Sequence, residues 1–302
     1  MADRTGQDRR TVTVIGGSGF LGSHVADQLS DAGFRVRIYD RTPSRWARPD
    51  QDVILGDLSD PALLDRAIAG AIAVFNFAAI ADLNDALDRP VETVQVNVLG
   101  NVRVLEACRA HAVQRFIYAS TVYVYSREGG FYRCSKQAAE HYVEEYQRAY
   151  GLDYTILRYG SLYGPRADAS NGLLRIVRDA LRTSTISYEG NPESVREYIH
   201  VEDAARASVV AMGEEFRNQS IVLTGHEPTR VHDLLKMLAE MLGIPDSRVG
   251  FRNEAYAGHY VRTPYAYQPK LGRKYTPPLH VDLGQGLLEL IDEVRKNYGE
   301  TG

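Results

Sequence analysis

One tyrosine and one lysine have the spacing and the surroundings that proton transfer needs. Tyr132 and Lys136 are four positions apart, which in a helix places their side chains on one face, one turn from each other. An ammonium group beside a phenol favours the phenolate and lowers a pKa that starts at about 10. Such a phenol can accept a proton from a substrate hydroxyl while hydride leaves the same carbon. Just upstream, Ser120 and Thr121 offer a hydroxyl that can hold the substrate oxygen, so we predict hydride-transfer chemistry on an alcohol.

A glycine-rich segment near the start of the chain indicates where the hydride acceptor binds. The stretch VIGGSGFLGSHVADQL contains G-x-G-x-x-G at Gly17, Gly19 and Gly22, and Gly16 extends the pattern. The glycines let the backbone approach a pyrophosphate, whose charge is offset by the N–H groups of the helix that follows. Such turns also occur without a ligand, so the motif needs support from elsewhere. The residues predicted to contact the cofactor here are Gly16, Gly19, Phe20, Leu21 and Gly22.

Asp40 supplies that support, because it ends the second apolar run about 20 residues after the glycine loop. A carboxylate at this place accepts hydrogen bonds from the ribose hydroxyls of adenosine and repels a 2′-phosphate. The sequence therefore predicts NAD rather than NADP as the cofactor. Arg41, Ser44 and Arg45 follow directly and could hold a phosphate if Asp40 turned away, which leaves NADP as the alternative.

The elements that must position these residues alternate between apolar runs and amphipathic stretches. Strands of this kind, each followed by a helix, are typical of a parallel sheet covered on both faces, and we predict an α/β fold with a Rossmann-type, doubly wound parallel sheet. Strands are expected at 11–16, 34–40, 52–55, 72–78, 115–120 and 153–159. Helices are expected at 20–32, 61–69, 97–112 and 132–150.

The pattern loosens after Gly164 and Pro165, where single strands and long loops separate the predicted helices 173–181, 201–212, 231–242 and 283–294. We therefore predict a smaller α/β lobe at the C-terminal end that binds substrate. The expected organisation is a disordered tail over 1–10 and an NAD-binding domain over 11–165, which regains segments from the C-terminal half. Residues 166–302 would form mainly the substrate lobe.

Composition excludes several other classes of protein. The chain has 302 residues, 44% hydrophobic and 25% charged, with a net charge of −4, which is typical of a globular protein and gives no basic face for nucleic acid. The longest apolar run, 67–81, is too short to span a bilayer, and the polar N-terminus has no apolar signal segment. Two cysteines give neither a disulfide framework nor a metal site. We expect a cytoplasmic protein without a metal.

Several motifs in order resemble one family, the extended short-chain dehydrogenase/reductases, in the NAD-dependent nucleotide-sugar epimerase/dehydratase group. The resemblance runs over most of the chain. Its motifs are GGSGFLG, GDLSD (56–60), NFAA (76–79), NVLGNVRVLEACR (97–109), YRCSK (132–136), LRYGSLYGPR (157–166), REYIHVEDAARA (196–207) and GQGLLELI (284–291).

The resemblance implies a role for each matching residue. Thr121 falls at the catalytic Ser/Thr position, Tyr132 at the acid/base, and Lys136 at its partner on the nicotinamide ribose. Further cofactor contacts are implied for Asp57 and Leu58 at the adenine, Ala78 and Ala79 at the pyrophosphate, Asn97 near the active site, and Tyr159 and Gly160 at the nicotinamide. On the substrate side it implies Arg196 and Arg262 at the diphosphate, with Thr121, Tyr123 and Ser161 near the sugar. It also implies a homodimer formed through helices 97–112 and 132–150.

The family's reactions place different demands on the residues after Thr121. A 4,6-dehydratase of this group carries an Asp-Glu pair there, whereas this chain has Val122 and Tyr123. A reductase/epimerase resembling GDP-fucose synthase has a Cys near position 121 and a His after the YGP turn, where this chain has Arg166. The stretch 122–131 is also shorter than usual in the family. We predict a nucleotide-sugar 4-epimerase that works through a transient 4-keto intermediate.

A nucleotide-sugar dehydrogenase or 4-ketoreductase, with NAD or NADP, is the alternative, because it needs the same residues. A non-catalytic dinucleotide sensor is less favoured, because Thr121, Tyr132 and Lys136 are all present.

Overall fold

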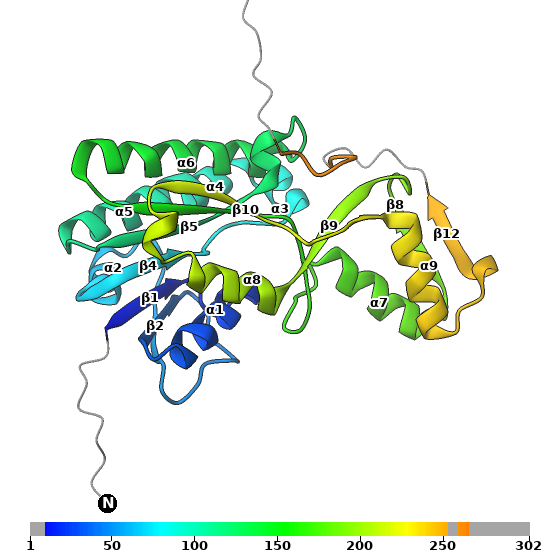
Figure 1. The fold of residues 1–302 in the computed structure, drawn as a ribbon, viewed down its shortest axis with the longest axis horizontal. Helices are drawn as coiled ribbons and strands as arrows, with labels where there is room; N and C mark the ends of the chain where they lie inside the picture. The colour runs from blue at the N-terminus through cyan, green and yellow to red at the C-terminus, as the bar shows by residue number, and fades with distance from the viewer. Residues whose placement is uncertain (1–9, 253–258, 266–302) are drawn as a thin grey trace, which may run out of the picture. The chain divides into compact units, whose positions relative to one another are not determined.

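The computed structural model describes residues 10–252 and 259–265, and its centre is a parallel sheet of seven strands (Figure 1). The strands lie in the order β10-β6-β5-β4-β1-β2-β3, and every neighbouring pair is parallel. Their bounds are β1 (Thr11–Ile15), β2 (Arg35–Asp40), β3 (Asp52–Leu55), β4 (Ala71–Asn76), β5 (Arg115–Thr121), β6 (Tyr154–Tyr159) and β10 (Gln219–Leu223). The predicted doubly wound sheet is confirmed.

Helices cover both faces of this sheet, which explains why its strands are apolar along their whole length. Figure 1 shows α1 (Phe20–Asp31) and α8 (Val201–Val210) on one side of the sheet. On the other side lie α2 (Pro61–Ile68), α5 (Asn101–Ala110) and α6 (Gly130–Tyr150). Each face has its own buried cluster, so the strand ends that carry the candidate site are held rigidly from both sides.

The segment before α5 differs from the prediction. A helix was expected only from residue 97, but α3 (Leu83–Asp88), α4 (Pro90–Val94) and a π-helical segment, Gln95–Gly100, precede α5. The Asp82 side chain accepts hydrogen bonds from the first N–H groups of α3, and Pro90 begins α4, where a missing N–H costs nothing. These helices are too short for their periodicity to show in the sequence.

Beyond residue 160 the chain forms two small sheets and, between their strands, adds one strand to the large sheet. β7 (Ser161–Tyr163), β9 (Val195–His200) and β11 (Pro228–Arg230) form one sheet, and β8 (Ile186–Glu189) pairs with β12 (Val249–Arg252). α7 (Gly172–Thr183) and α9 (Val231–Leu242) share a buried cluster with β8. Between α8 and β11 the chain returns to the large sheet, where β10 is the outermost strand beside β6.

Some predictions concern parts of the chain outside the described residues. These are nearly all of the predicted tail, the helix at 283–294 and the GQGLLELI motif. The division at residue 165 stays a prediction. Within the described residues, no helix combines the length and apolar character that crossing a membrane requires.

Candidate active site

The strand order reverses at β1, which has β2 on one side and β4 on the other. In open parallel sheets, ligands bind in the crevice beyond the carboxyl ends of the strands at such a point. The glycine loop follows β1 there. Gly16 has a left-handed φ of 76°, and a Cβ on it would lie 2.6 Å from the Ala78 backbone nitrogen. A Cβ on Gly22 would overlap the Gly16 carbonyl oxygen, so both positions require glycine.

The start of α1 is suited to an anion. No side chain among the described residues caps this helix, and its first turn has no acidic residue. Its first N–H groups and the positive end of its dipole therefore face the crevice. The loop and this helix end fit the pyrophosphate of a dinucleotide, because they combine free donors with a backbone that no side chain covers.

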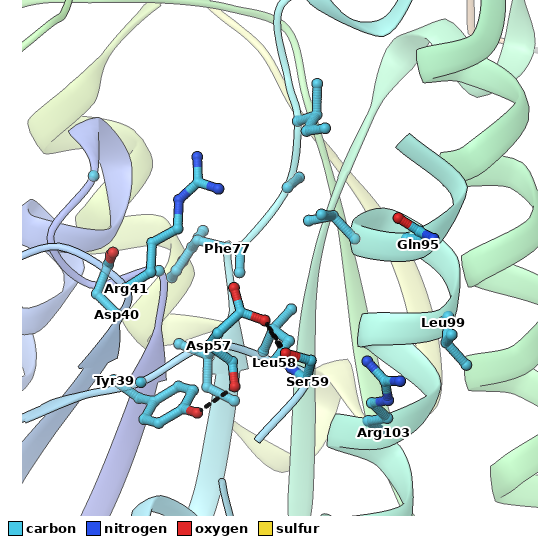
Figure 2. Close-up of a pocket in the computed structure, with 18 of the residues that line it drawn as sticks. Tyr39, Asp40, Arg41, Asp57, Leu58, Ser59, Phe77, Gln95, Leu99 and Arg103 are labelled. Carbon is cyan, nitrogen blue, oxygen red and sulfur yellow. Dashed lines mark hydrogen bonds between the residues drawn. The ribbon is translucent and has the colours of Figure 1, made fainter. Parts of the chain in front are cut away.

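Asp40 lies beside the glycine loop at the end of β2. Its carboxylate accepts hydrogen bonds from the backbone N–H groups of Ser18 and Thr42, each at 3.0 Å. These bonds fix the carboxylate at the rim of the crevice. Arg41, its neighbour, lines the same crevice (Figure 2).

The first of two adjoining cavities has a volume of about 520 Å³ and is lined by the loop, Asp40 and the end of β3 (Figure 2). Two hydrogen bonds from Ser59 hold the pKa of Asp57 below its ordinary value, and the Tyr39 hydroxyl donates to the Asp57 carbonyl at 2.7 Å. Asp57, Leu58, Ala78 and Ala79, which the family resemblance placed at the cofactor, all line this cavity.

The second cavity, of about 480 Å³, brings the predicted catalytic residues together. Its walls include Thr121, Tyr132 and Lys136, and it shares Gly16, Gly19, Phe77 and Ala79 with the first cavity. The remaining predicted residues on its walls are Phe20, Leu21, Gly22, Tyr123, Tyr159 and Gly160. The two cavities thus adjoin at the glycine loop and together extend from Asp57 to Tyr132.

Burial shifts both titrating groups of the site toward their uncharged forms. Burial raises the pKa of Tyr132 to about 12, although a hydrogen bond with Thr121 lowers it. Burial also lowers the pKa of Lys136 from 10.5 to about 7, and its Nζ donates to the Ala119 carbonyl at 2.7 Å. Without a ligand, burial therefore outweighs the lowering of the Tyr132 pKa, and the effect of Lys136 on it stays a prediction.

Asn97 connects two elements of the fold through hydrogen bonds. It lies in the π-helical segment and is 2% exposed. Its side chain accepts a hydrogen bond from the Ile80 N–H and donates to the Ile80 carbonyl and to the Ser135 hydroxyl, at 2.7, 3.0 and 2.9 Å. It thereby ties the loop after β4 to α6 beside Lys136, and it lines neither cavity.

Three predicted substrate residues do not line either cavity in the described part of the chain: Ser161, Arg196 and Arg262. Arg262 is exposed, whereas Arg196 is 6% exposed. The Arg196 guanidinium lies 4.5 Å from the centre of the Tyr260 ring, which packs in turn on Tyr123. Arg196 is therefore one aromatic side chain away from the wall of the second cavity.

Sequence reasoning missed other residues on the cavity walls. Gln95, Leu99 and Arg103 recur every four positions and face the first cavity, a helical spacing that was present in the sequence (Figure 2). Asp168 and Arg175 line the second cavity. His259 also lines it and is hydrogen-bonded to the Tyr123 hydroxyl, but nothing in its local sequence indicated this.

Known proteins resemble this chain in sequence and in fold. A "Putative UDP-glucose 4-epimerase" of Methanocaldococcus jannaschii is 25% identical, over 95% of this chain and 99% of its own length. The solved UDP-glucose 4-epimerase of Thermotoga maritima with UDP-glucose is 27% identical, with a TM-score of 0.76, over 95% of this chain and 99% of that chain. The dTDP-glucose 4,6-dehydratase DesIV of Streptomyces venezuelae, with NAD bound, is 26% identical, with a TM-score of 0.76, over 95% and 98%.

The family model that matches describes the "NAD dependent epimerase/dehydratase family" and covers residues 12–223. That span contains the glycine loop, Asp40 and the three predicted catalytic residues. The expected cofactor, NAD, is the cofactor of this family. The chain belongs to the NAD-dependent epimerase/dehydratase family.

Proposed function

We propose that this protein is an NAD-dependent nucleotide-sugar 4-epimerase in which Tyr132 transfers the proton at the sugar's 4-oxygen. The observation that carries the proposal is the grouping of Tyr132, Thr121 and Lys136 on the wall of a cavity that adjoins the dinucleotide crevice. When bound, NAD would accept hydride from C4 and return it. Gly16, Asp40 and Asp57 would hold its adenosine diphosphate half, and Lys136 the ribose of its other half.

The side chains carry the proton part of the reaction. The Tyr132 hydroxyl, once deprotonated, takes the proton of the 4-hydroxyl as the C4–H bond breaks, and it returns the proton to the same oxygen when that bond re-forms on the other face. The Thr121 hydroxyl, which is hydrogen-bonded to Tyr132, holds the oxygen in line. Because the pKa of Tyr132 is about 12 in the site without a ligand, a nearby positive charge is needed to lower it.

The carboxylates on the wall of the second cavity argue against a dehydratase. Elimination needs a base at C5 and an acid at the C6 hydroxyl, and the two residues after Thr121 are Val122, which is 1% exposed, and Tyr123. Among the described lining residues, the carboxylates are Asp82 and Asp168. Both accept hydrogen bonds from backbone N–H groups of their own turns. A dehydrogenase or 4-ketoreductase, which needs only Tyr132, Thr121 and Lys136, is the second candidate.

A buried cation supports a nucleotide diphosphate as part of the substrate. Arg196 is 6% exposed, and among the described residues its guanidinium donates to a neutral acceptor, the Val195 carbonyl, at 3.2 Å. A buried guanidinium without an acidic partner is costly, and an anionic ligand would offset that cost. We therefore assign the diphosphate to Arg196, with Arg262 as a second contact, and the sugar to Thr121, Tyr123 and Ser161. In this assignment residues 11–165 bind mainly NAD, and the later residues bind mainly substrate.

An exposed apolar surface supports the homodimer. Val91 and Val94 on α4 are 70% and 55% exposed, and Tyr142 and Tyr150 on α6 are 47% and 58% exposed. A second copy of the chain would bury these side chains. Sedimentation of the purified protein tests this, since a monomer at micromolar concentration would contradict it.

Proton NMR of the purified enzyme tests the reaction. We expect one of a panel of UDP-, GDP-, CDP- and dTDP-sugars to be converted to its C4-inverted isomer with no cofactor added, because an epimerase recycles its NAD. Conversion that starts only when NAD is supplied, with accumulation of NADH, would show a dehydrogenase instead.

A further inference from the structure

One face of α6 holds the end of β5 at three consecutive residues. Along this face, Tyr132, Lys136 and Glu140 follow one another at four-residue intervals. Tyr132 is hydrogen-bonded to Thr121, and Lys136 Nζ donates to the Ala119 carbonyl at 2.7 Å. The third contact, from the Ser120 hydroxyl to Glu140 Oε1, measures 2.5 Å. The catalytic Thr121 is therefore preceded by two residues that the same helix face fixes.

Glu140 on α6 is hydrogen-bonded to one residue of β5 and one residue of β6. Its side chain is 7% exposed, and Arg158 on β6, 14% exposed, donates to both of its oxygens at 3.0 and 2.6 Å. Arg158 is also hydrogen-bonded to the Tyr125 hydroxyl and lies 4.7 Å from the centre of that ring. Ser120 and Arg158 are partners in the register of β5 and β6, so the ion pair joins two strands and a helix directly behind the catalytic residues.

The contribution of this ion pair to folding stability does not explain why it is present. Taking two charges out of water costs about as much as their attraction returns, and apolar side chains of similar volume often fill such sites at no loss. The pair instead places a negative charge one helical turn from Lys136. The titratable groups next to Lys136 are Tyr132 on its own helix, Tyr118 on β5 and Glu140, which Arg158 holds. Asp82 and Asp168 line the same cavity. Of these groups, Glu140 raises the pKa of Lys136 against the effect of burial.

We propose that Glu140 is a positioning residue of the active site, which fixes Thr121 through Ser120 and places its negative charge one helical turn from Lys136. The inference rests on the proposed function for its effect on turnover. The Lys136 part does not, because the charge of that lysine can be measured without a substrate.

Three single variants separate the two roles of Glu140. Ser120→Ala removes the hydrogen bond and leaves the ion pair, and we expect kcat to fall about 10- to 100-fold with an unchanged pH profile, because Thr121 loses its fixed position. Glu140→Gln removes the charge, and we expect the alkaline limb of the pH profile to move down by about one pH unit. Tyr125→Phe is the matched control, because it removes the hydroxyl that is hydrogen-bonded to Arg158 and leaves Ser120 and Glu140 in place, so it should keep the wild-type profile.

Titration of ¹⁵N-lysine-labelled holoenzyme by NMR measures the lysine directly. The chain has few lysines, and we expect one, Lys136, to titrate far below the others in wild type and lower still in Glu140→Gln. If Glu140→Gln does not fold, the double variant Glu140→Gln/Arg158→Gln is measured in its place, because it leaves no unpaired buried cation. An unchanged lysine pKa, or an equal loss of kcat in Tyr125→Phe and Ser120→Ala, would overturn the inference. A shifted lysine pKa in a protein that converts no sugar would overturn the proposed function alone.

Discussion

Replacing Lys136 by methionine should stabilise the cofactor-free protein while abolishing its turnover. Lys136 is 3% exposed, and burial lowers its pKa from 10.5 to about 7. The difference between these values corresponds to about 5 kcal/mol, of which about 4 kcal/mol applies at pH 7. Methionine has a similar length and no charge to bury. It leaves the Ala119 carbonyl without its donor, at a cost of about 1–3 kcal/mol, so the expected net gain at pH 7 is about 1–3 kcal/mol.

The pH dependence of this gain identifies its cause. Between pH 7 and 10.5 the unfolded chain holds the lysine proton and the folded chain does not, so wild-type stability rises with pH over this window. The methionine variant lacks this rise. Its advantage should therefore be largest at and below pH 7 and should vanish as the pH approaches the ordinary pKa of lysine.

Urea unfolding of both proteins at several pH values, after removal of NAD, measures the effect. Lys236→Met on α9 is the matched control, because Lys236 is exposed and its replacement should change stability by no more than about 0.5 kcal/mol at any pH. If Lys136→Met is less stable than wild type at pH 6, or if its advantage is the same at pH 6 and pH 9, the buried lysine does not carry the cost that we assign to it.

Three further predictions concern the cofactor crevice and the proton transfer. Gly22→Ala should lose NAD binding, because its Cβ would overlap the Gly16 carbonyl oxygen. The control Gly172→Ala has open space at its Cβ and should bind NAD normally, and calorimetry measures both affinities. Asp40→Ala should weaken NAD binding about 10-fold or more and reduce the preference over NADP, and equal affinities in wild type and variant would contradict the role of this carboxylate. Tyr132→Phe should abolish turnover and retain NAD, and surviving activity would refute the proposed proton transfer.

The parts of the site that follow from local spacing could be predicted from the sequence. Strand, glycine loop and helix are consecutive in the chain, so the pattern predicts their geometry directly, and Tyr132 and Lys136 share a face because one helix contains both. The spacing of Gln95 and Arg103 is equally local and was available in the same way. Resemblance to a family added Asp57, which has no local pattern of its own, and the structure places it on the crevice wall.

What the sequence could not supply depends on burial and on distant contacts. Burial raises the pKa of Tyr132 and lowers that of Lys136 because several elements remove water from them, and no four-residue motif reports that. Arg196 and Tyr260 meet across more than sixty residues of chain, and Glu140 meets Arg158 from a different element. Such pairs become visible only when the strands and helices are placed together.

The order of the two pKa values has a consequence for when the site becomes reactive. Without a ligand, the proton stays on Tyr132 and Lys136 is close to losing its charge at neutral pH, so the site holds almost no phenolate. Positive charge placed in the crevice lowers the pKa of Tyr132 and lowers that of Lys136 as well. The lysine therefore needs a fixed negative partner to stay charged at the moment when the phenolate forms, and Glu140, held by Arg158, is in position to be that partner. On this argument the ion pair behind the site is required because the crevice in front of it receives a cation.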